Sequence, residues 1–151
     1  MHIAFLGFGQ VGAPLADHLQ RLGHEVTLAA RDPQSEKARR AMARNPSLKT
    51  APPPEAVRGA EVVFLATPFQ ANEAALQAVA GELKDKILVD CTNPVGPGLT
   101  HGLNNAQSGS DMIQKLVPQA RVVKAFTIYG FENFENNAFP AYTVKPAMFF
   151  C

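Results

Sequence analysis

The sequence predicts an α/β fold in which a doubly wound, mostly parallel sheet carries helices on both faces. Short apolar runs alternate with segments in which apolar residues recur every three or four positions, as expected for strands alternating with helices. Several runs are almost wholly apolar, which is typical of strands covered on both faces. The chain has 151 residues, 46% hydrophobic and 18% charged, enough for one ordinary domain with its own core.

The amino-terminal half opens with a strand, a helix and a second strand. Apolar residues fill His2–Leu6, and after Gly9 they recur at helical spacing until Gly23, a residue type common at helix ends. Glu25–Ala30 is the second expected strand. This half then continues with a charged helix over Gln34–Arg44 and a weak strand over Leu48–Thr50, ahead of a proline run that continues neither a helix nor a central strand.

The carboxy-terminal half has two near-continuous apolar runs, Val62–Ala66 and Lys86–Cys91, which we expect to be buried strands. Ala71–Leu83 between them has a helical pattern. Thr92–Gly109 is rich in proline and glycine and is expected to form a long loop. The remaining expected elements are a short helix over Ser110–Leu116, a sixth strand over Arg121–Phe126, a segment without clear periodicity over Tyr129–Tyr142 and a final strand over Ala147–Cys151.

The composition disfavours several classes of partner. With 14 basic and 13 acidic side chains the net charge is +1, which gives no basic field to attract nucleic acid or an anionic membrane. No run approaches the roughly 20 apolar residues of a membrane span, and the amino terminus has no basic leader. The two cysteines have neither the density of a disulfide scaffold nor the spacing of a metal site. We therefore expect a cytoplasmic protein without a metal, a nucleic-acid partner or a membrane partner.

A G-x-G-x-x-G pattern joins the first expected strand to the first helix. Its residues are Gly7, Phe8, Gly9, Gln10, Val11 and Gly12. In this context the first glycine permits a tight turn, the second lets the backbone approach a pyrophosphate, and the third lets the helix pack on the strand. Backbone N–H groups and the helix dipole then face the anion. The pattern predicts a Rossmann-like dinucleotide-binding domain over residues 1–151.

The end of the second strand favours NADP over NAD. Enzymes that use NAD commonly carry an acidic residue about 20 residues beyond the glycine motif, which binds the ribose 2′-hydroxyl. Arg31 stands at that distance here, and its guanidinium can hold a 2′-phosphate. Two alternatives stay open: Asp32 reaches the ribose if the register shifts by one residue, or Arg31 is an ordinary solvated charge. Lys37 is a second candidate for the phosphate.

Three other expected strands finish in small or polar residues, namely Ala66-Thr67-Pro68, Cys91-Thr92-Asn93-Pro94 and Ala125-Phe126-Thr127. In an open parallel sheet the carboxyl ends of the strands share the edge where ligands bind. We expect these turns to line the nicotinamide half of the cofactor, although Thr-Pro and Asn-Pro pairs also start ordinary loops. No acid–base pair stands out among the four scattered histidines, so no catalytic residue is assigned.

With these motifs in view, the chain resembles the coenzyme F420-dependent NADP oxidoreductase family. The ferric reductase domains of the STEAP proteins are similar too. The resemblance rests on the glycine motif, Arg31-Asp32-Pro33, Asn93-Pro94 and Val122–Phe126. It implies a Rossmann domain that binds NADP(H) and exchanges hydride with a flavin-like acceptor. It also implies that the glycine turn and Arg31 hold the phosphates, and that the nicotinamide side is formed by Ala66, Thr67, Pro68, Asn93 and Ala125.

The chain departs from the family pattern at two positions. Ala30 stands where members commonly have serine, which removes a hydroxyl from the 2′-phosphate site and weakens the expected affinity for NADP. Thr127 stands where they commonly have asparagine, which leaves the acceptor open. Family members also continue past residue 151, and the final expected strand has no turn or polar tail after it. We therefore expect a domain truncated at its carboxy-terminal end.

The function expected from the sequence is hydride transfer between NADP(H) and a deazaflavin, coenzyme F420, or a flavin-type acceptor. Two alternatives stay open. One is an NADP-dependent reductase of a small imine or hydroxy acid, of the pyrroline-5-carboxylate reductase or β-hydroxyacid dehydrogenase type. The other is a non-catalytic NADP-binding module. A homodimer is also left open.

Overall fold

The computed structural model describes residues 1–136, 138–139, 141 and 147–151. Six strands form one sheet in the order β3-β2-β1-β4-β5-β6, and all neighbouring strands are parallel. The chain winds outward from β1 in both directions, which confirms the doubly wound α/β fold. The strands are β1 (His2–Leu6), β2 (Glu25–Ala29), β3 (Lys49–Ala51), β4 (Val62–Leu65), β5 (Ile87–Asp90) and β6 (Arg121–Lys124).

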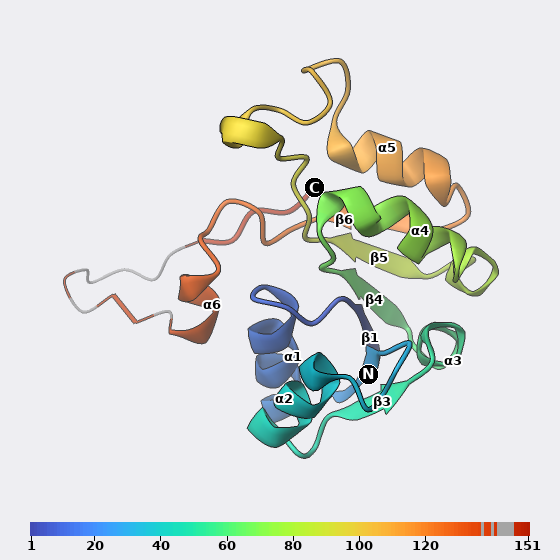
Figure 1. Ribbon diagram of the computed structural model, residues 1–151, viewed down its shortest axis with the longest axis vertical. Coiled ribbons are helices and arrows are strands. Elements are labelled where there is room, and N and C mark those ends of the chain that lie inside the picture. The colour runs from blue at the N-terminus through green and yellow to red at the C-terminus, as the bar shows by residue number, and fades with distance from the viewer. Residues whose placement is uncertain (137, 140, 142–146) are drawn as a thin grey trace.

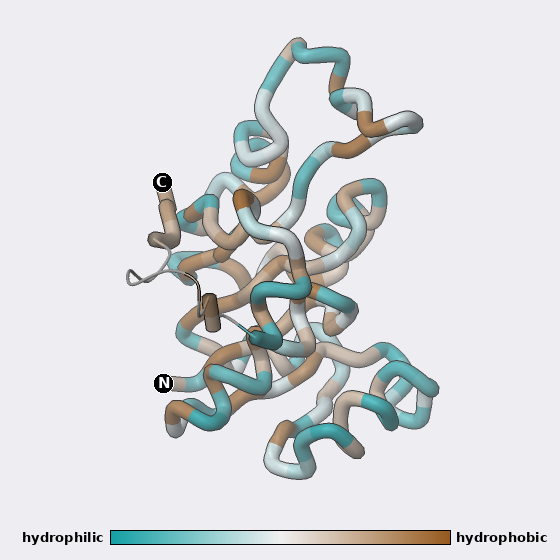
Figure 2. The backbone as a smooth tube through the Cα atoms, turned by 90° about the vertical axis from the view of Figure 1, so that its left-hand side faces the viewer, coloured by the Kyte–Doolittle hydropathy of each residue, from teal (hydrophilic) through white to brown (hydrophobic). Residues whose placement is uncertain are grey.

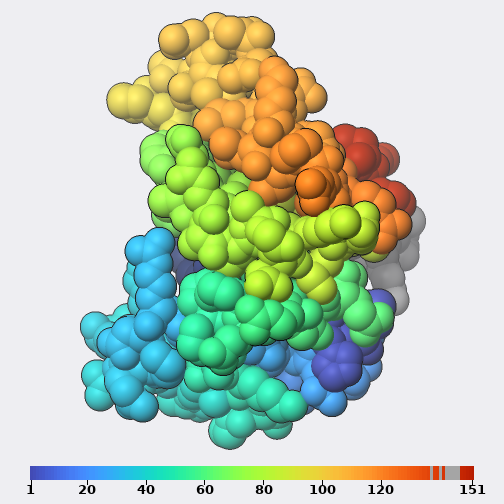
Figure 3. Space-filling model, turned by 90° about the vertical axis from the view of Figure 1, so that its right-hand side faces the viewer, coloured from blue at the N-terminus to red at the C-terminus, as the bar shows by residue number. Residues whose placement is uncertain are grey.

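Helices cover both faces of this sheet, as the sequence predicts (Figure 1). One face carries α1 (Gly12–Arg21), α2 (Glu36–Arg44) and α6 (Glu132–Glu135). The opposite face carries α3 (Pro53–Arg58), α4 (Asn72–Gln77) and α5 (Gly109–Leu116), which Figure 3 shows as a continuous band from green to orange. Each face therefore has its own layer of helices.

The core consists of two clusters, one on each side of the sheet. Successive strand residues alternate between them, so that Phe5 belongs to one cluster while Ala4 and Leu6 belong to the other. Phe5 is paired with Phe64 across β1 and β4, and their rings stack with centroids 4.7 Å apart. The apolar strands accordingly run through the middle of the molecule between more polar helices and loops (Figure 2). Burial on both faces explains why the strands are apolar runs.

The helix expected over Ala71–Leu83 is wrong as a single element. The chain instead forms a 3₁₀ turn at Phe69–Ala71, the helix α4, and a second 3₁₀ turn at Ala80–Leu83. The break falls at Val79, whose φ is −133°. Val79 and Leu83 are nevertheless both fully buried, so the irregular geometry turns both side chains into the core. Tertiary packing overrides the local helical pattern here.

Sequence analysis missed α3, which begins inside the proline run. Pro53 and Pro54 occupy the first helical positions, and Pro52 precedes them as the N-cap residue. Proline is well tolerated there because the first N–H groups of a helix have no intrahelical partner. The helix buries Val57 completely against the core. The prolines thus start a helix as well as ending the preceding strand.

The final strand expected over Ala147–Cys151 is also wrong. Only Phe150 pairs with the sheet, through an isolated antiparallel bridge to Ala125. The strand β6 ends at Lys124 and not at Phe126, because Phe126 has a left-handed backbone with φ of 62°. This conformation breaks the alternation of the strand, so Ala125 and Phe126 both pack into the same core cluster.

The segment that follows, expected over Tyr129–Tyr142 without clear periodicity, includes the short helix α6. Residues 137, 140 and 142 of that segment lie outside the described residues.

Cys91 follows β5 and is buried with its thiol directed toward the core. Its Sγ lies 3.8 Å from the carbonyl oxygen of Val89. Burial, followed by the negative charge of Asp90, raises the pKa of this thiol from its ordinary value of 9.0 to about 12. Cys91 is therefore a neutral packing residue at physiological pH. Cys151, in contrast, is exposed.

The raised pKa of Cys91 predicts a loss of stability at alkaline pH. Between about pH 9 and pH 12 the thiol ionises in the unfolded chain but stays protonated in the folded one, so stability is complete below this window and falls as pH rises through it. The slope from one such group is about 1.4 kcal/mol per pH unit. Urea denaturation at several pH values measures it. Cys91→Ala is expected to remove this part of the slope and Cys151→Ala to leave it unchanged; equal slopes in all three proteins would contradict the prediction.

Candidate functional site

The turn between β1 and α1 is packed so closely that two of its glycines are required by the chain itself. Gly7 has a φ of 93°, and a Cβ there would lie 2.6 Å from the backbone carbonyl of Ala66. A Cβ on Gly12 would lie 2.2 Å from the carbonyl oxygen of Gly7. Such distances are far inside van der Waals contact. These glycines therefore hold the start of α1 against the ends of β1 and β4.

Gly9 differs from its two neighbours in the motif. No atom of the described chain lies within 4 Å of the position of its Cβ, its φ is not positive, and it is exposed. The packing of the chain therefore places no demand for glycine at this position. A glycine that leaves open space beside its backbone fits the close approach of a group from outside the chain.

The start of α1 is suited to an anion. The N-cap residue Val11 makes no side-chain hydrogen bond, and no acidic residue lies in the first turn. The positive end of the helix dipole is therefore not neutralised by an acidic residue of the first turn. Ala13 donates its N–H to the carbonyl oxygen of Gly9 and Pro14 has no N–H, so among the first three helical residues the N–H of Gly12 is the one left for an external acceptor. Together with the open side of Gly9, this geometry can hold a pyrophosphate.

A hollow beside this turn brings together Gly7, Arg31 and Thr67 with residues of α3 and α4. Figure 3 looks toward this region, between light-blue atoms of the segment after β2 and yellow-green atoms of α4. Arg31 is exposed and forms no salt bridge with any residue that the structure describes. Its guanidinium is therefore available for a bidentate contact with a phosphate.

The other charged candidates near the ribose end have different positions. Asp32 accepts a hydrogen bond from the backbone N–H of Gln34 at 2.8 Å, which uses one carboxylate oxygen to close the turn before α2. Lys37 lies on the other side of the glycine turn, where it lines a groove with Phe8 and Gln10. Among the three charged candidates, Arg31 is thus the one that lines the hollow with Gly7.

The residues expected at the nicotinamide side fall into two places. Thr67 lines the hollow with Arg31, next to half-buried Ala66 and exposed Pro68. Asn93 is exposed and donates a hydrogen bond from Nδ2 to the carbonyl oxygen of Thr127 at 3.3 Å, which links the turns after β5 and β6. Ala125 is buried in the core, and its N–H donates to the carbonyl oxygen of Asp90 at 3.1 Å. Its side chain therefore does not reach the edge.

Sequence analysis missed a buried polar network below these turns. Asp90, at the end of β5, is fully buried. Its Oδ1 accepts hydrogen bonds from the backbone N–H and the hydroxyl of Thr92, at 2.9 and 2.7 Å. Its Oδ2 accepts from the hydroxyl of Ser110 and the ammonium of Lys124, each at 2.9 Å. An aspartate at the end of an otherwise apolar run was the available signal, because a buried charge requires partners.

The network continues from Asp90 to the hollow through two further residues. Asn72, at the start of α4, is 1% exposed and donates from Nδ2 to the hydroxyl oxygen of Thr92 at 2.8 Å. Thr67 donates its hydroxyl proton to Oδ1 of Asn72 at 2.7 Å. Lys124 also donates to the carbonyl oxygen of Thr92. The ends of β4, β5 and β6 are therefore joined by one set of hydrogen bonds.

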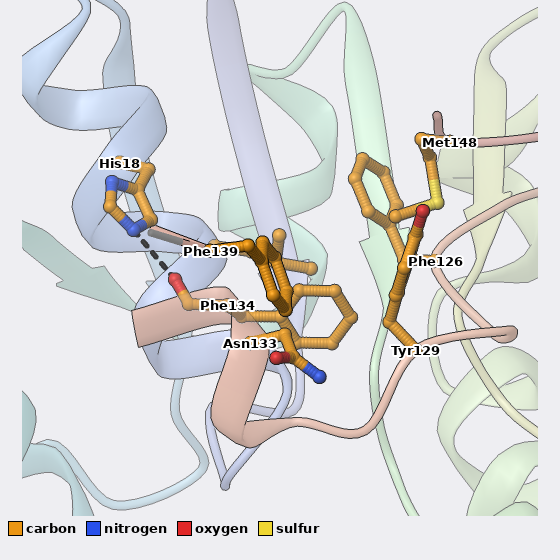
Figure 4. A pocket seen from close by; sticks show the side chains of 8 residues that line it. His18, Phe126, Tyr129, Asn133, Phe134, Phe139 and Met148 are labelled. Carbon is orange, nitrogen blue, oxygen red and sulfur yellow. Dashed lines mark hydrogen bonds between the residues drawn. The ribbon is translucent and has the colours of Figure 1, made fainter. Parts of the chain in front are cut away.

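An apolar pocket of about 280 Å³ lies apart from this edge, between α1 and the segment after β6. Figure 4 shows His18 of α1 on one side and the side chains of Phe126, Tyr129 and Met148 on the other. His18 Nε2 lies 2.6 Å from the carbonyl oxygen of Phe134, so the ring binds the backbone of α6. Of the turns that the sequence predicts at the nicotinamide half of the cofactor, only Phe126 contributes a residue to the lining of this pocket.

His101, in the loop after β5, is the histidine expected nearest to the carboxyl edge of the sheet. Nδ1 of His101 accepts hydrogen bonds from the backbone N–H groups of Leu103 and Asn105, so it stabilises its own loop. Across the described residues no cluster of three or more His, Cys, Asp or Glu could hold a metal ion. No helix in the same part of the chain has the length and apolar character needed to cross a membrane.

Comparison with known proteins identifies similar sequences and structures. Metalloreductase STEAP3 from Rattus norvegicus is 33% identical over 127 residues, which cover 83% of this chain and 24% of that protein. The F420-dependent NADP reductase of Methanothermobacter thermautotrophicus is 34% identical over 104 residues, 63% of this chain and 44% of that protein. The chain thus spans less than half the length of either relative.

A crystal structure from Arthrobacter sp. FB24, of a protein assigned as an F420-dependent NADP reductase, superposes with a TM-score of 0.80 and 35% identity. The match covers 88% of this chain and 65% of that one. The family model described as NADP oxidoreductase, coenzyme F420-dependent, matches residues 2–94, which include the glycine turn, Arg31, Thr67 and Asn93. The chain belongs to this family of NADP-dependent oxidoreductases.

Proposed function

We propose that this chain binds NADP(H) along the carboxyl edge of its sheet and positions it for hydride exchange with a deazaflavin or flavin-type acceptor. The observation that carries the proposal is the shared hollow of Gly7, Arg31 and Thr67 beside the uncapped start of α1. A ligand with one phosphate group would need only one of these two features, the hollow with Arg31 or the start of α1. A dinucleotide with a 2′-phosphate has two phosphate groups to place, a pyrophosphate and a ribose phosphate.

The residues present fit that cofactor. The N–H of Gly12 at the start of α1 and the open backbone at Gly9 would hold the pyrophosphate. Arg31 would pair with the 2′-phosphate, and the serine hydroxyl that family members commonly supply is absent at Ala30. The turn at Asn93, held to the carbonyl oxygen of Thr127, would meet the nicotinamide half. Asn93 would then act through the position of its turn as well as through its own amide.

The chemistry asks little of the side chains beyond orientation. The nicotinamide supplies or receives the hydride when it is bound. The chain contributes the distance and angle between two planar rings and excludes water from between them. Hydride transfer between two bound rings needs no acid–base pair of side chains. This agrees with the positions of His18 and His101, whose ring nitrogens bond to backbone groups.

Two rival functions remain testable beside this one. A reductase of small imines or hydroxy acids would use the same cofactor site with a different acceptor. A non-catalytic NADP-binding module would bind the cofactor without turnover. We favour hydride transfer to a deazaflavin or flavin because the family model and two of the proteins compared above carry coenzyme F420 in their names. Both cysteines are free thiols, which fits the proposed cytoplasmic location.

The first prediction separates packing glycines from the ligand glycine. Gly12→Ala forces a Cβ against the carbonyl oxygen of Gly7 and is expected to destabilise the fold by about 1–3 kcal/mol or more. Gly9→Ala meets no atom of the described chain, so its unfolding free energy should stay within about 0.5 kcal/mol of the parent. It should nevertheless weaken NADPH binding by a similar 1–3 kcal/mol. Urea denaturation and calorimetry measure the two effects, and unchanged NADPH affinity in Gly9→Ala would count against the site.

The second prediction concerns the 2′-phosphate. Arg31→Ala is expected to weaken NADPH binding by about 1.5–3 kcal/mol, because it removes a charge-assisted contact, and to change NADH binding much less. Isothermal titration calorimetry with both cofactors gives the difference directly. Arg39→Ala is the matched control, since Arg39 is an exposed arginine on α2 that does not line the hollow. An equal loss for NADPH and NADH would remove Arg31 from the phosphate site.

The third prediction concerns the reaction itself. NADPH labelled with deuterium on one face of C4 is expected to transfer its label stereospecifically to a deazaflavin or flavin acceptor. Mass spectrometry of the reduced acceptor measures the transfer. Turnover confined to imines or hydroxy acids would favour the first rival. Tight NADPH binding without oxidation by any acceptor in the panel would favour the non-catalytic module.

A further inference from the structure

The hydroxyl of Thr67 is one end of a hydrogen-bonded chain whose other end is a buried carboxylate. Thr67 Oγ1 lies 2.7 Å from Oδ1 of Asn72, and Asn72 Nδ2 lies 2.8 Å from Oγ1 of Thr92. Thr92 Oγ1 in turn lies 2.7 Å from Oδ1 of Asp90. Asn72 and Asp90 are 1% and 0% exposed, so bulk water does not compete for the links between them. Each link therefore constrains the next.

Asp90 decides which group donates and which accepts in each hydrogen bond of this series. Its two oxygens accept from the backbone N–H and hydroxyl of Thr92, the hydroxyl of Ser110 and the ammonium of Lys124, and a carboxylate paired with an ammonium has no proton to donate. Thr92 has one hydroxyl proton and must give it to Asp90. Asn72 must then present its NH₂ group to Thr92, which fixes the orientation of its amide. The carbonyl oxygen of Asn72 is left facing Thr67, so Thr67 donates its own proton inward.

This leaves the hydroxyl of Thr67 with only lone pairs to offer a ligand. Thr67 lines the hollow with Gly7 and Arg31, so a ligand group that hydrogen-bonds to its hydroxyl there has to be the donor. Phosphate oxygens are acceptors at neutral pH and are not suited to this position. In the adenosine half of a 2′-phosphorylated dinucleotide, the ribose keeps one donor, the 3′-hydroxyl, on the carbon next to the one that bears the phosphate.

We propose that Thr67 is a specificity-determining residue whose Oγ1 accepts a hydrogen bond from the 3′-hydroxyl of the cofactor's adenosine ribose. Asp90, Thr92 and Asn72 are positioning residues that keep Thr67 in this acceptor state. The proposal rests on the proposed function, since it takes the hollow beside Arg31 to hold the adenosine half. It moves Thr67 from the nicotinamide side, where the sequence resemblance puts it, to the ribose beside Arg31.

The test uses cofactor fragments, so it needs no turnover. Adenosine 2′,5′-bisphosphate, its 3′-deoxy analogue and its 3′-deoxy-3′-fluoro analogue are titrated into the protein by calorimetry. The 3′-hydroxyl compound is expected to bind about 2–10-fold more tightly than the 3′-deoxy compound, the effect of one net hydrogen bond. The fluoro compound, which cannot donate, should bind no better than the deoxy compound.

Variants of Thr67 and Asn72 separate this contact from a merely structural role. Thr67→Val keeps the shape but has no acceptor, so the three ligands should bind alike. Thr67→Ser keeps the hydroxyl and should keep the preference for the 3′-hydroxyl compound. Asn72→Ala frees the proton of Thr67 and should reduce that preference, which is read as the ratio of the affinities for the hydroxyl and deoxy compounds in the same variant. General damage to the hollow would instead weaken all three ligands together.

Each contrary outcome has a distinct meaning. Equal affinity of the parent protein for the hydroxyl and deoxy compounds would overturn the assignment of Thr67 and leave the proposed NADP(H) site in place. An equal loss for all three ligands in Thr67→Val would show that Thr67 contacts the base or only supports the hollow, and would also overturn it. No binding of any of the three compounds to the parent protein would overturn both this inference and the proposed function.

Discussion

At Gly7 the backbone leaving β1 passes so close to Ala66 and Thr67 that a side chain cannot fit between them. This contact fixes where the turn runs, and the contact of Gly12 with the same turn fixes where α1 begins. The side of Gly9 that no other part of the described chain approaches, and the N–H of Gly12, are left for a group from outside the chain. Because the same contact places Thr67 next to the turn, the hollow beside Arg31 is also a product of this packing. At both glycines a Cβ would lie less than 3 Å from a neighbouring backbone atom, and this close backbone packing shapes both proposed phosphate sites.

Below the strand ends, a charge is buried where an apolar residue could have packed. Asp90 and Lys124 are parallel neighbours on β5 and β6, and the carboxylate is satisfied by donors from three parts of the chain. Buried ion pairs contribute little to stability, because desolvation offsets their attraction. Their directional bonds instead fix the relative positions of the groups they join. Here those groups are the ends of β4, β5 and β6, at the edge of the sheet where we propose that the cofactor binds.

The two departures from the family pattern have different consequences once the structure is considered. Ala30 is buried and its N–H donates to the carbonyl oxygen of Ala51, so this position supplies backbone to the sheet but no hydroxyl. Thr127 is contacted by Asn93 through its carbonyl oxygen, which every residue type has. The link between the turns after β5 and β6 therefore survives the replacement of asparagine by threonine. Under the proposed function, the first departure would lower the affinity for the 2′-phosphate, and the second would change only the side chain presented to the hydride acceptor.

The sequence by itself determined the elements whose signals are local. Strands covered on both faces must be apolar runs, and the glycine spacing of residues 7–12 reflects a turn that needs glycine at fixed positions. The doubly wound parallel sheet and the glycine turn followed from those signals. Sequence reasoning also placed Arg31 correctly at the end of the second strand, because its distance from the motif is set by one helix and one strand.

Only the tertiary structure decided the features that depend on residues far apart in the chain. The irregular geometry around Val79 and the left-handed backbone of Phe126 exist because each side chain packs into a core that no local pattern describes. Asp90 bonds to Lys124 and Ser110 because of the strand order and not because of their spacing in the sequence. For the same reason Thr67 and Arg31 line one hollow. Local periodicity reports which face of an element is buried. It carries no information about which polar groups meet at the edge, since that is set by how the strands are ordered.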